Sequence, residues 1–480
     1  MDELENIKNF LGMEPLKTVQ NPEKLPLEEQ FQLFLPDILP QEEKQLLTRF
    51  LIYKYRGEKR EGEKEEEERF RDLIRADTIM GEEFIPSLIS TLKQLDRYMR
   101  LGGETSLTSE QLRQILQDMV YDYRVKLDAR DLKILDRMGR SPFITIKEIA
   151  EETNTSYTTI QRRRKMLEER CRLGIYPRIN YPHIGLINML LLVEGEAQVQ
   201  SPYLLSRQEL YGGISLYTFF SMAVPPKAVN PVYREFEKRA PRLWTWIIDS
   251  FESSFSPDFY DVDEGDWKID WKAWSLYLSN VLSRGWSRAL PPEEVGRMRP
   301  PTSPPEKAGG VAIRELRLID ALSRNFNAAI EDLCRGLGCN ARTIIRTRER
   351  LLRRGTIQLS LGIDQIGLNE HILFIVESHP DTLHSFAAAL RRLPKAWIYW
   401  ARNLNGEGEA LVCWLEAPPG SITPLERAVR RRLLPLAKYK LFFRSHQEGS
   451  RIPLLELFDV QTRAWRWSPE MLKITLGRTG

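Results

Sequence analysis

The chain of 480 residues lacks several features that identify common membrane and enzyme classes. No apolar run approaches the roughly 20 residues that a bilayer-spanning helix needs, and the opening stretch MDELENIKNF has no signal-peptide pattern. A phosphate-binding glycine loop, a dinucleotide-binding fingerprint and a serine nucleophile elbow are also missing. These absences predict a protein without a membrane partner. They also give no support to a nucleotide-binding enzyme or a serine hydrolase.

Cysteine is scarce as well. The four cysteines are scattered and do not form the framework of a secreted disulfide-rich domain, so a reducing cytoplasm is expected. Only Cys334 and Cys339 are close in sequence, and no histidine stands beside them at zinc-ligand spacing. We therefore expect small core residues at both positions, with no metal ion and no cofactor.

The net charge of +3 favours no particular partner, so the distribution of charge matters more than its sum. Residues 56–72 mix both signs densely with few apolar residues, which predicts a solvated helix or a flexible linker. The arginines cluster elsewhere, in TSYTTIQRRRKML (155–167) and CNARTIIRTRERL (339–351). These two arginine-rich segments resemble each other.

The similarity of the two segments extends into a long internal repeat. Upstream, LKILD ending at Asp136 aligns with LRLID ending at Asp320, in the same register as the arginine-rich segments. Downstream, HIGL aligns with QIGL, where Ile184 matches Ile366 after a slightly shorter loop in the second copy. A register kept over such a span indicates duplication of a whole domain or more. The matched pairs inside the segments are Thr159 and Thr343, Ile160 and Ile344, Arg162 and Arg346, Arg164 and Arg348, and Leu167 and Leu351.

Apolar residues recur at helical spacing within each copy. Three short helices are expected, the last two joined by a tight turn, which is a helix-turn-helix. Ser156 in the first copy and Asn340 in the second are suitable N-caps for the third helix. We expect the segments that follow, GIYPRINYPHIGL and TIQLSLGIDQIGL, to form extended hairpins, the wings of two winged helix-turn-helix motifs.

The first copy resembles the Lrp/AsnC (feast/famine) family of transcription regulators. Residues 127–186 match the family's LD..D..IL opening, its S..T...R...L recognition helix and its..LG motif, and residues 313–368 follow them more loosely. The resemblance implies a small βαββαβ sensor domain after each motif. Residues 369–480 contain that order, from the strand EHILFIVES to the strand KYKLFFRSH. After the first copy, AQVQSPYLLSRQELYGG is too short for a full helix and strand, so that domain is incomplete.

The sequence thus predicts an α+β multidomain protein with two winged helix-turn-helix domains, each followed by a ferredoxin-like domain, and an α-helical domain at the amino terminus. Two similar tails, YDVDEGDWKIDWKAW and FDVQTRAWRW, carry spaced tryptophans (Trp271, Trp274, Trp465 and Trp467). We expect them to pack on their own sheets rather than to stack on nucleic-acid bases. The expected boundaries are 1–126 for the helical domain, 127–186 and 313–368 for the motifs, 187–289 and 369–480 for the sensor-like domains, and 290–312 for a proline-rich linker.

The third helix of each motif carries the candidate DNA-binding residues. If Ile160 and Leu167 face the core, helical spacing places polar and cationic side chains outward, where they suit base edges and phosphates. The alternative is a merely solvated basic face. The predicted DNA-binding residues are Tyr157, Thr158, Gln161, Arg162, Arg163 and Lys165 in the first motif and Arg342, Ile345, Arg346 and Arg350 in the second. Arg170 and Arg172 could add phosphate contacts.

The second helix fits DNA less well than the first. Ile345 and Glu349 stand where the first helix has Gln161 and Lys165. Ile345 could touch a thymine methyl group or belong to a protein interface. If the duplicated halves pair internally, as sensor domains do in the family, the unequal helices predict an asymmetric operator with half-sites about 34 Å apart.

The resemblance also implies an effector site, because sensor domains of the family bind amino acids at inter-subunit clefts. The turn NLNGEGEA, with Asn405, Gly406 and Gly408, corresponds to the family's glycine-containing ligand loop, and Gly212 and Gly213 are the candidates in the first copy. The simpler interpretation is that these glycines only make hairpin turns.

The predicted function is therefore that of a cytoplasmic, sequence-specific regulator of transcription that binds double-stranded DNA and has no catalytic residues. A homodimer, a small-molecule effector and a transcription-machinery protein bound by residues 1–126 are the other partners considered. One alternative is a protein-interaction component of that machinery with diverted motifs. Another is an enzyme similar to siroheme decarboxylases, which also resemble the family, but the five histidines form no constellation repeated in both copies.

Overall fold

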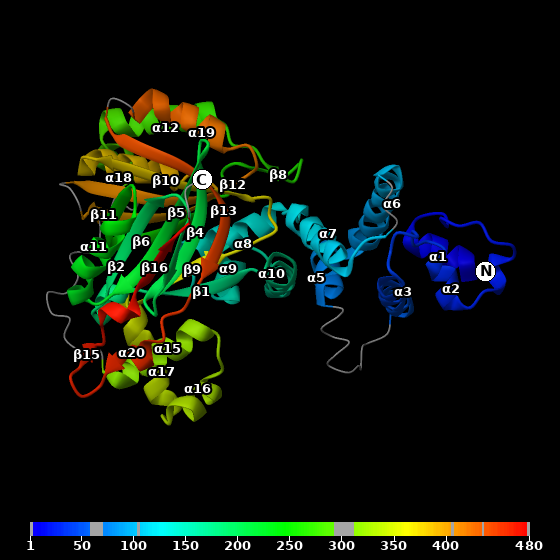
Figure 1. Cartoon of the computed structure of the whole chain (residues 1–480), viewed down its shortest axis with the longest axis horizontal. Helices are drawn as coiled ribbons and strands as arrows, with labels where there is room; N and C mark the ends of the chain where they lie inside the picture. Colours follow the sequence, from blue (N-terminus) through cyan, green and yellow to red (C-terminus); the bar gives the residue numbers. More distant parts are fainter. Residues whose placement is uncertain are drawn as a thin grey trace. The chain divides into compact units, whose positions relative to one another are not determined.

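The computed structural model describes residues 3–57, 71–102, 106–291, 312–404, 408–433 and 436–477 (Figure 1). Most of the predicted charged segment and linker lie outside these ranges. The described chain divides into two compact units. The first comprises residues 1–126, 165–173 and 363–367, and the second comprises 127–164, 174–362 and 368–480. None of the described helices combines the length and hydropathy that a bilayer crossing requires.

The first unit is built from helices around an aromatic core. Phe31, Phe34 and Phe84 are fully buried there. The last of its helices begins at a capping box, in which Thr108 and Gln111 exchange side-chain and backbone hydrogen bonds. The helices are α1 (Glu3–Leu11), α2 (Leu27–Gln32), α3 (Gln41–Arg56), α5 (Arg71–Met80), α6 (Phe84–Gly102) and α7 (Ser109–Asp122).

Two sets of three helices occupy the positions of the repeated motifs. Ser156 and Asn340 cap the third helices as predicted, since their side chains accept from the backbone N–H groups of Thr159 and Thr343. The carboxyl half of the first of these helices, from Lys165, belongs to the first unit. The helices are α8 (Ala129–Arg140), α9 (Ile146–Glu152) and α10 (Tyr157–Cys171), then α15 (Ile313–Arg324), α16 (Ile330–Leu337) and α17 (Ala341–Arg353).

The two wing segments do not form the expected hairpins. Each contributes one strand, β1 (Gly174–Ile179) or β9 (Ile357–Gly362), and the two strands pair with each other in antiparallel register. Pro177 lies opposite Leu359, its counterpart in the downstream alignment of the repeat. A Cβ atom on Gly362 would lie 2.1 Å from the Tyr176 ring, so this close pairing needs a glycine. The hairpin prediction was wrong because a local turn competed with a partner strand far away in sequence.

The strands of the two sensor-like segments form one closed barrel instead of two separate sheets. Its order is β10-β12-β11-β6-β2-β5-β4-β13. In each set of four, the fourth strand along the chain lies beside the first, then come the third and the second, and the sets join at β11–β6 and at β13–β4. Closure leaves neither set with an open edge. The strands are β2 (Ile187–Glu194), β4 (Leu204–Gly212), β5 (Ser215–Val224), β6 (Leu243–Phe255), β10 (Glu370–Ser378), β11 (Lys395–Asn403), β12 (Glu409–Ala417) and β13 (Lys438–Gly449).

The helices that accompany the barrel strands differ between the sets. The second set has α18 (Pro380–Leu390) and α19 (Ile422–Leu433), which completes a βαββαβ order. The first set has only α11 (Val229–Arg239). Where its other helix would stand, β3 (Ala197–Gln200) pairs with β16 (Lys473–Leu476), near the end of the chain. The sequence prediction that this copy is too short for a helix is confirmed.

The two tryptophan-bearing tails pack against the opposite set of strands, so the prediction that they cover their own sheets was wrong. The first tail includes α12 (Trp271–Arg284), and its Trp274 donates a 2.8 Å hydrogen bond to the carbonyl of Ala389 on α18. In the second tail, Trp465 donates a 2.9 Å hydrogen bond to the carbonyl of Ile184. The missing first helix accounts for the position of the second tail, because Trp465 and its neighbours join the buried cluster that contains Leu191 on that side of the first set. The remaining tail elements are β7 (Tyr260–Asp261), β8 (Asp266–Trp267), α13 (Trp286–Ala289), α20 (Leu454–Leu457), β14 (Phe458–Asp459) and β15 (Ala464–Trp465).

Candidate nucleic-acid interface

Helix α10 has the two faces that its sequence predicts. Ile160 and Leu167 are 1% and 0% exposed, so they anchor the helix in the protein core. Tyr157 is 50% exposed. The other predicted contact residues on the outer face, Thr158, Gln161, Arg162 and Lys165, are also exposed. This face carries two side chains suited to base edges, Gln161 and Arg162, beside a further cation.

Arg163 has a different environment. Its guanidinium lies 2.5 Å from Asp128 Oδ2 and 3.5 Å from Asp131 Oδ2, at the start of α8. Partial burial raises the pKa of Asp128, but backbone N–H groups and the charge of Arg163 outweigh that effect and lower it. Asp131 is fully buried, and burial raises its pKa. The arrangement makes Arg163 an internal clamp between α8 and α10.

Two further arginines of this region have partners within the first unit. Arg170 donates 2.9 Å hydrogen bonds to the carbonyl of Ile79 and to the hydroxyl of Tyr123. Arg172 lies 4.0 Å from a carboxylate oxygen of Asp364. The suggested phosphate contacts of Arg170 and Arg172 thus compete with these internal interactions.

The outer face of α17 is more mixed. Arg342 and Arg346 are exposed, and Ile345 between them on the helix surface is 43% exposed. Arg350, in contrast, lies 2.7 Å from Glu315 Oε1 of α15. Of the four residues predicted to contact DNA in this motif, Arg350 is exposed like the others, but its guanidinium is engaged in an ion pair within the protein.

The structure also shows a basic cleft that the sequence analysis did not identify. Its volume is about 470 Å³, and both motifs line it, with Lys147 and Arg164 from the first and Phe326 and Arg348 from the second. The Arg348 guanidinium lies 4.4 Å from the centre of the Phe326 ring, and burial lowers its pKa. The available signal was the alignment itself, because Arg164 and Arg348 are matched residues of the repeat.

The glycines considered for an effector site lie at turns. Gly213 has a φ of +65° in the hairpin between β4 and β5, and a Cβ atom on Gly212 would lie 2.9 Å from the Phe442 ring. Gly408, with a φ of +137°, precedes β12. Asn405 and Gly406 lie outside the described residues. The conformations of Gly213 and Gly408 and the packing at Gly212 account for glycine at these positions without a ligand.

Comparisons with known proteins identify the first motif. A family model described as winged helix-turn-helix DNA-binding matches residues 127–170. The comparison with curated proteins found no match. Residues 127–170 thus form a winged helix-turn-helix DNA-binding domain, and the exposed face of α10 belongs to it.

Two solved structures are similar at a low level. One is the crystal structure of the siroheme decarboxylase NirDL, with 14% sequence identity and a TM-score of 0.34. The match spans 67% of this chain and 93% of the NirDL chain. The other is the same enzyme in complex with an iron-uroporphyrin III analogue, at 12% identity, 68% and 93% coverage and a TM-score of 0.35. At these scores neither structure bears on the function of this chain.

Proposed function

We propose that this protein is a sequence-specific, double-stranded DNA-binding regulator of transcription and not an enzyme. The carrying observation is the DNA-binding motif at residues 127–170, whose helix α10 exposes Gln161 and Arg162 together on one face. A glutamine can make paired hydrogen bonds to adenine and an arginine to guanine in the major groove. Lys165, one turn further along the same face, is exposed and suited to a phosphate.

The proposal includes a tandem arrangement of two winged helix-turn-helix motifs with ferredoxin-like domains, similar to an Lrp/AsnC dimer joined in one chain. It is supported by the constant register of the sequence repeat, by the pairing of β1 with β9 and by the matching strand orders in the two halves of the barrel. Such a pseudo-two-fold arrangement would address two half-sites about 34 Å apart.

The two motifs would contribute differently to recognition. In our proposal α10 reads bases, whereas α17 supplies Arg342 and Arg346 mainly to phosphates, because Glu349 and Ile345 are unsuited to most base edges. The basic cleft with Arg164 and Arg348 lies between the motifs, where it could attract the DNA backbone. The predicted operator is accordingly asymmetric, with stronger sequence preference in one half.

The experiment is selection of genomic DNA fragments by the full chain across a salt series, followed by sequencing of the retained fragments. We expect enrichment of a short asymmetric motif, with an affinity that falls steeply as salt rises. The double variant Gln161→Ala/Arg162→Ala should retain salt-dependent binding but lose the enrichment. Absence of enrichment by the unaltered chain at every salt concentration would contradict the proposal.

A second candidate is a protein-interaction component of the transcription machinery. The specific observation in its favour is Ile345, an apolar side chain that is 43% exposed at the centre of the α17 face. The same selection separates the candidates, because a protein-binding chain would enrich no DNA motif.

A further inference from the structure

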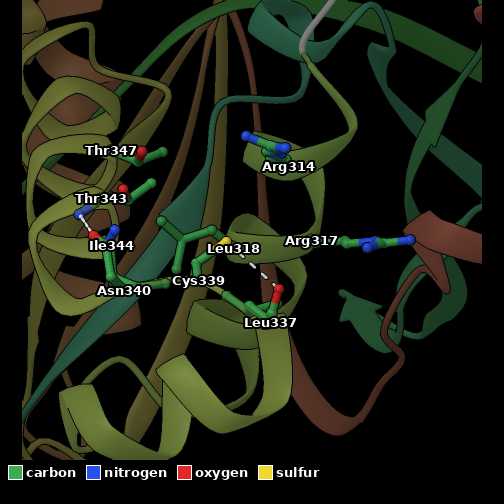
Figure 2. A pocket seen from close by; sticks show the side chains of 10 residues that line it. Arg314, Arg317, Leu318, Leu337, Cys339, Asn340, Thr343, Ile344 and Thr347 are labelled. Atoms are coloured by element: carbon green, nitrogen blue, oxygen red, sulfur yellow. Dashed lines mark hydrogen bonds between the residues drawn. The ribbon is translucent and has the colours of Figure 1, made fainter.

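The second motif contains an open pocket between α15 and α17, with a volume of about 370 Å³. Figure 2 shows Arg314 from α15 and Thr343 and Thr347 from α17 around the pocket, whereas the side chain of Arg317 extends from α15 away from the two threonines. Leu318, which is 1% exposed, also lines the pocket. The pocket thus combines the Arg314 guanidinium and two hydroxyl groups with an apolar wall.

Comparison with the first motif explains why there is space. Thr347 stands where the first motif has Arg163, in the register that also matches Asp320 with Asp136. In the first motif the arginine reaches across to the two acids at the start of α8. The shorter threonine cannot span the distance between the helices. The acid of the second motif, Glu315, pairs with Arg350 from the next turn of α17 instead.

The charges around the pocket are unbalanced. Arg314 and Arg317 are both exposed, and within the described part of the chain no ion pair or hydrogen bond occupies either guanidinium. None of the described residues that line the pocket carries a carboxylate, and the nearby Glu315 is engaged with Arg350 at 2.7 Å. An oxyanion would supply the missing negative charge, because a guanidinium binds carboxylate or phosphate through two parallel hydrogen bonds.

We propose that this pocket binds a small anion through a phosphate or carboxylate group, held by Arg314 and by the hydroxyls of Thr343 and Thr347. The volume lies at the lower end of the range of small-molecule pockets, which is about 300 to 1,000 Å³. The site is separate from the glycine turns considered for an effector. It does not depend on whether α17 contacts DNA.

The test is isothermal titration of the full chain with pyrophosphate and, separately, with citrate, at low ionic strength. Saturable binding of one or both is expected, and the preferred probe distinguishes phosphate from carboxylate chemistry. Thr347→Arg should weaken binding at least tenfold by filling the pocket as Arg163 fills its counterpart. Arg314→Ala should do the same, whereas Arg130→Ala, at the matching position of the first motif, should have no effect.

The half-buried thiol of Cys339 gives an independent readout, because it lines the pocket. In a Cys334→Ser background, the preferred anion should slow labelling of Cys339 by N-ethylmaleimide, and Thr347→Arg should abolish that protection. The absence of saturable binding of either probe would overturn the proposal, as would unchanged binding in Thr347→Arg with the melting temperature preserved. If a DNA duplex rather than either probe lost affinity in Thr347→Arg, the pocket would be a DNA-phosphate contact and the small-molecule site would be refuted.

Discussion

The two sets of three helices, α8 to α10 and α15 to α17, distribute their arginines differently. In the first set, Arg163 clamps α10 to buried Asp131, and Arg162 stays on the outer face. In the second set the clamp comes from Arg350, which pairs with Glu315. An acid at the third position of the opening helix needs a cation in both sets. In each set, the arginine of the third helix that pairs with this acid is no longer available to bind a ligand, and it stands at a different position in the two sets.

The barrel shows a second difference of this kind. Asn188 and His371 are the second residues of β2 and β10, the first strands of their sets. Burial, reinforced by the charges of Arg444 and Lys395, lowers the pKa of His371 to about 3. Glu416 lies 3.8 Å from His371 Nδ1 but only 2.6 Å from Lys395, so its charge is already balanced. One half of the barrel therefore contains a partly buried titratable group where the other has a neutral amide.

The largest expected effect concerns His371→Asn, which gives the second half the residue of the first. The unfolded chain takes up a proton near pH 6.5, whereas the folded chain resists it until about pH 3. Stability should therefore be lost as pH falls through this window. Between pH 7 and 4.5, we expect the unaltered chain to lose about 2–3 kcal/mol more unfolding free energy than the variant. Urea denaturation at several pH values measures this, and parallel pH profiles would contradict the assignment.

The next effect compares the two clamps. Arg163→Ala should cost about 2 kcal/mol of unfolding free energy, because it leaves the buried Asp131 carboxylate without its cation. Arg350→Ala should cost about 1 kcal/mol, since Glu315 retains Arg354 at 3.9 Å. Denaturant unfolding of the two variants measures both values. An equal cost would show that Arg354 does not compensate for the loss of Arg350.

A smaller effect is expected at the matched outer arginines. Arg162→Ala should weaken specific DNA binding at least tenfold, about 1.4 kcal/mol, without lowering the melting temperature. Arg346→Ala should weaken it less than about threefold if it contacts only phosphate. Fluorescence anisotropy on the selected operator tests both variants. A greater loss from Arg346→Ala would reverse the roles proposed for the two helices.

The smallest expected effect tests the acidic substitution on α17. Glu349→Lys places there the residue type that α10 has at Lys165, and it removes a carboxylate that repels phosphate. Affinity should rise a few fold, and the salt dependence should steepen by about one phosphate contact. Anisotropy in a salt series is again the measurement. An unchanged slope would indicate that α17 lies away from the DNA backbone.

Local patterns in the sequence were sufficient to predict much of this arrangement. The N-caps Ser156 and Asn340 and the buried faces at Ile160 and Ile344 followed from turn chemistry and helical spacing. The pairing of β1 with β9 and the exchanged tails were not predictable in this way, because each is a choice between partners far apart in sequence. The alternation of a strand is the same whichever partner it finds.

For the candidate site, too, the sequence predicted which residues are exposed but not which of them have partners within the protein. Exposure of Gln161 and Arg162 follows from the helical period, but the inward course of Arg163 depends on the position of buried Asp131 on another helix. The role of Arg170 likewise depends on Ile79 and Tyr123, which a recognition-helix pattern does not include. A sequence pattern identifies which residues are charged, but only packing decides which charges are already paired.

The exchanged tails impose an order on synthesis. The strand that closes the barrel, β13, begins at Lys438, and β16, which pairs with β3, begins at Lys473. Until those residues leave the ribosome, the first four strands have an unpaired edge at β4 and an uncovered apolar face. Such intermediates expose surface that aggregates, and their long-range pairing is slow. A nascent chain of this protein therefore needs protection from aggregation until β13 and β16 have emerged from the ribosome.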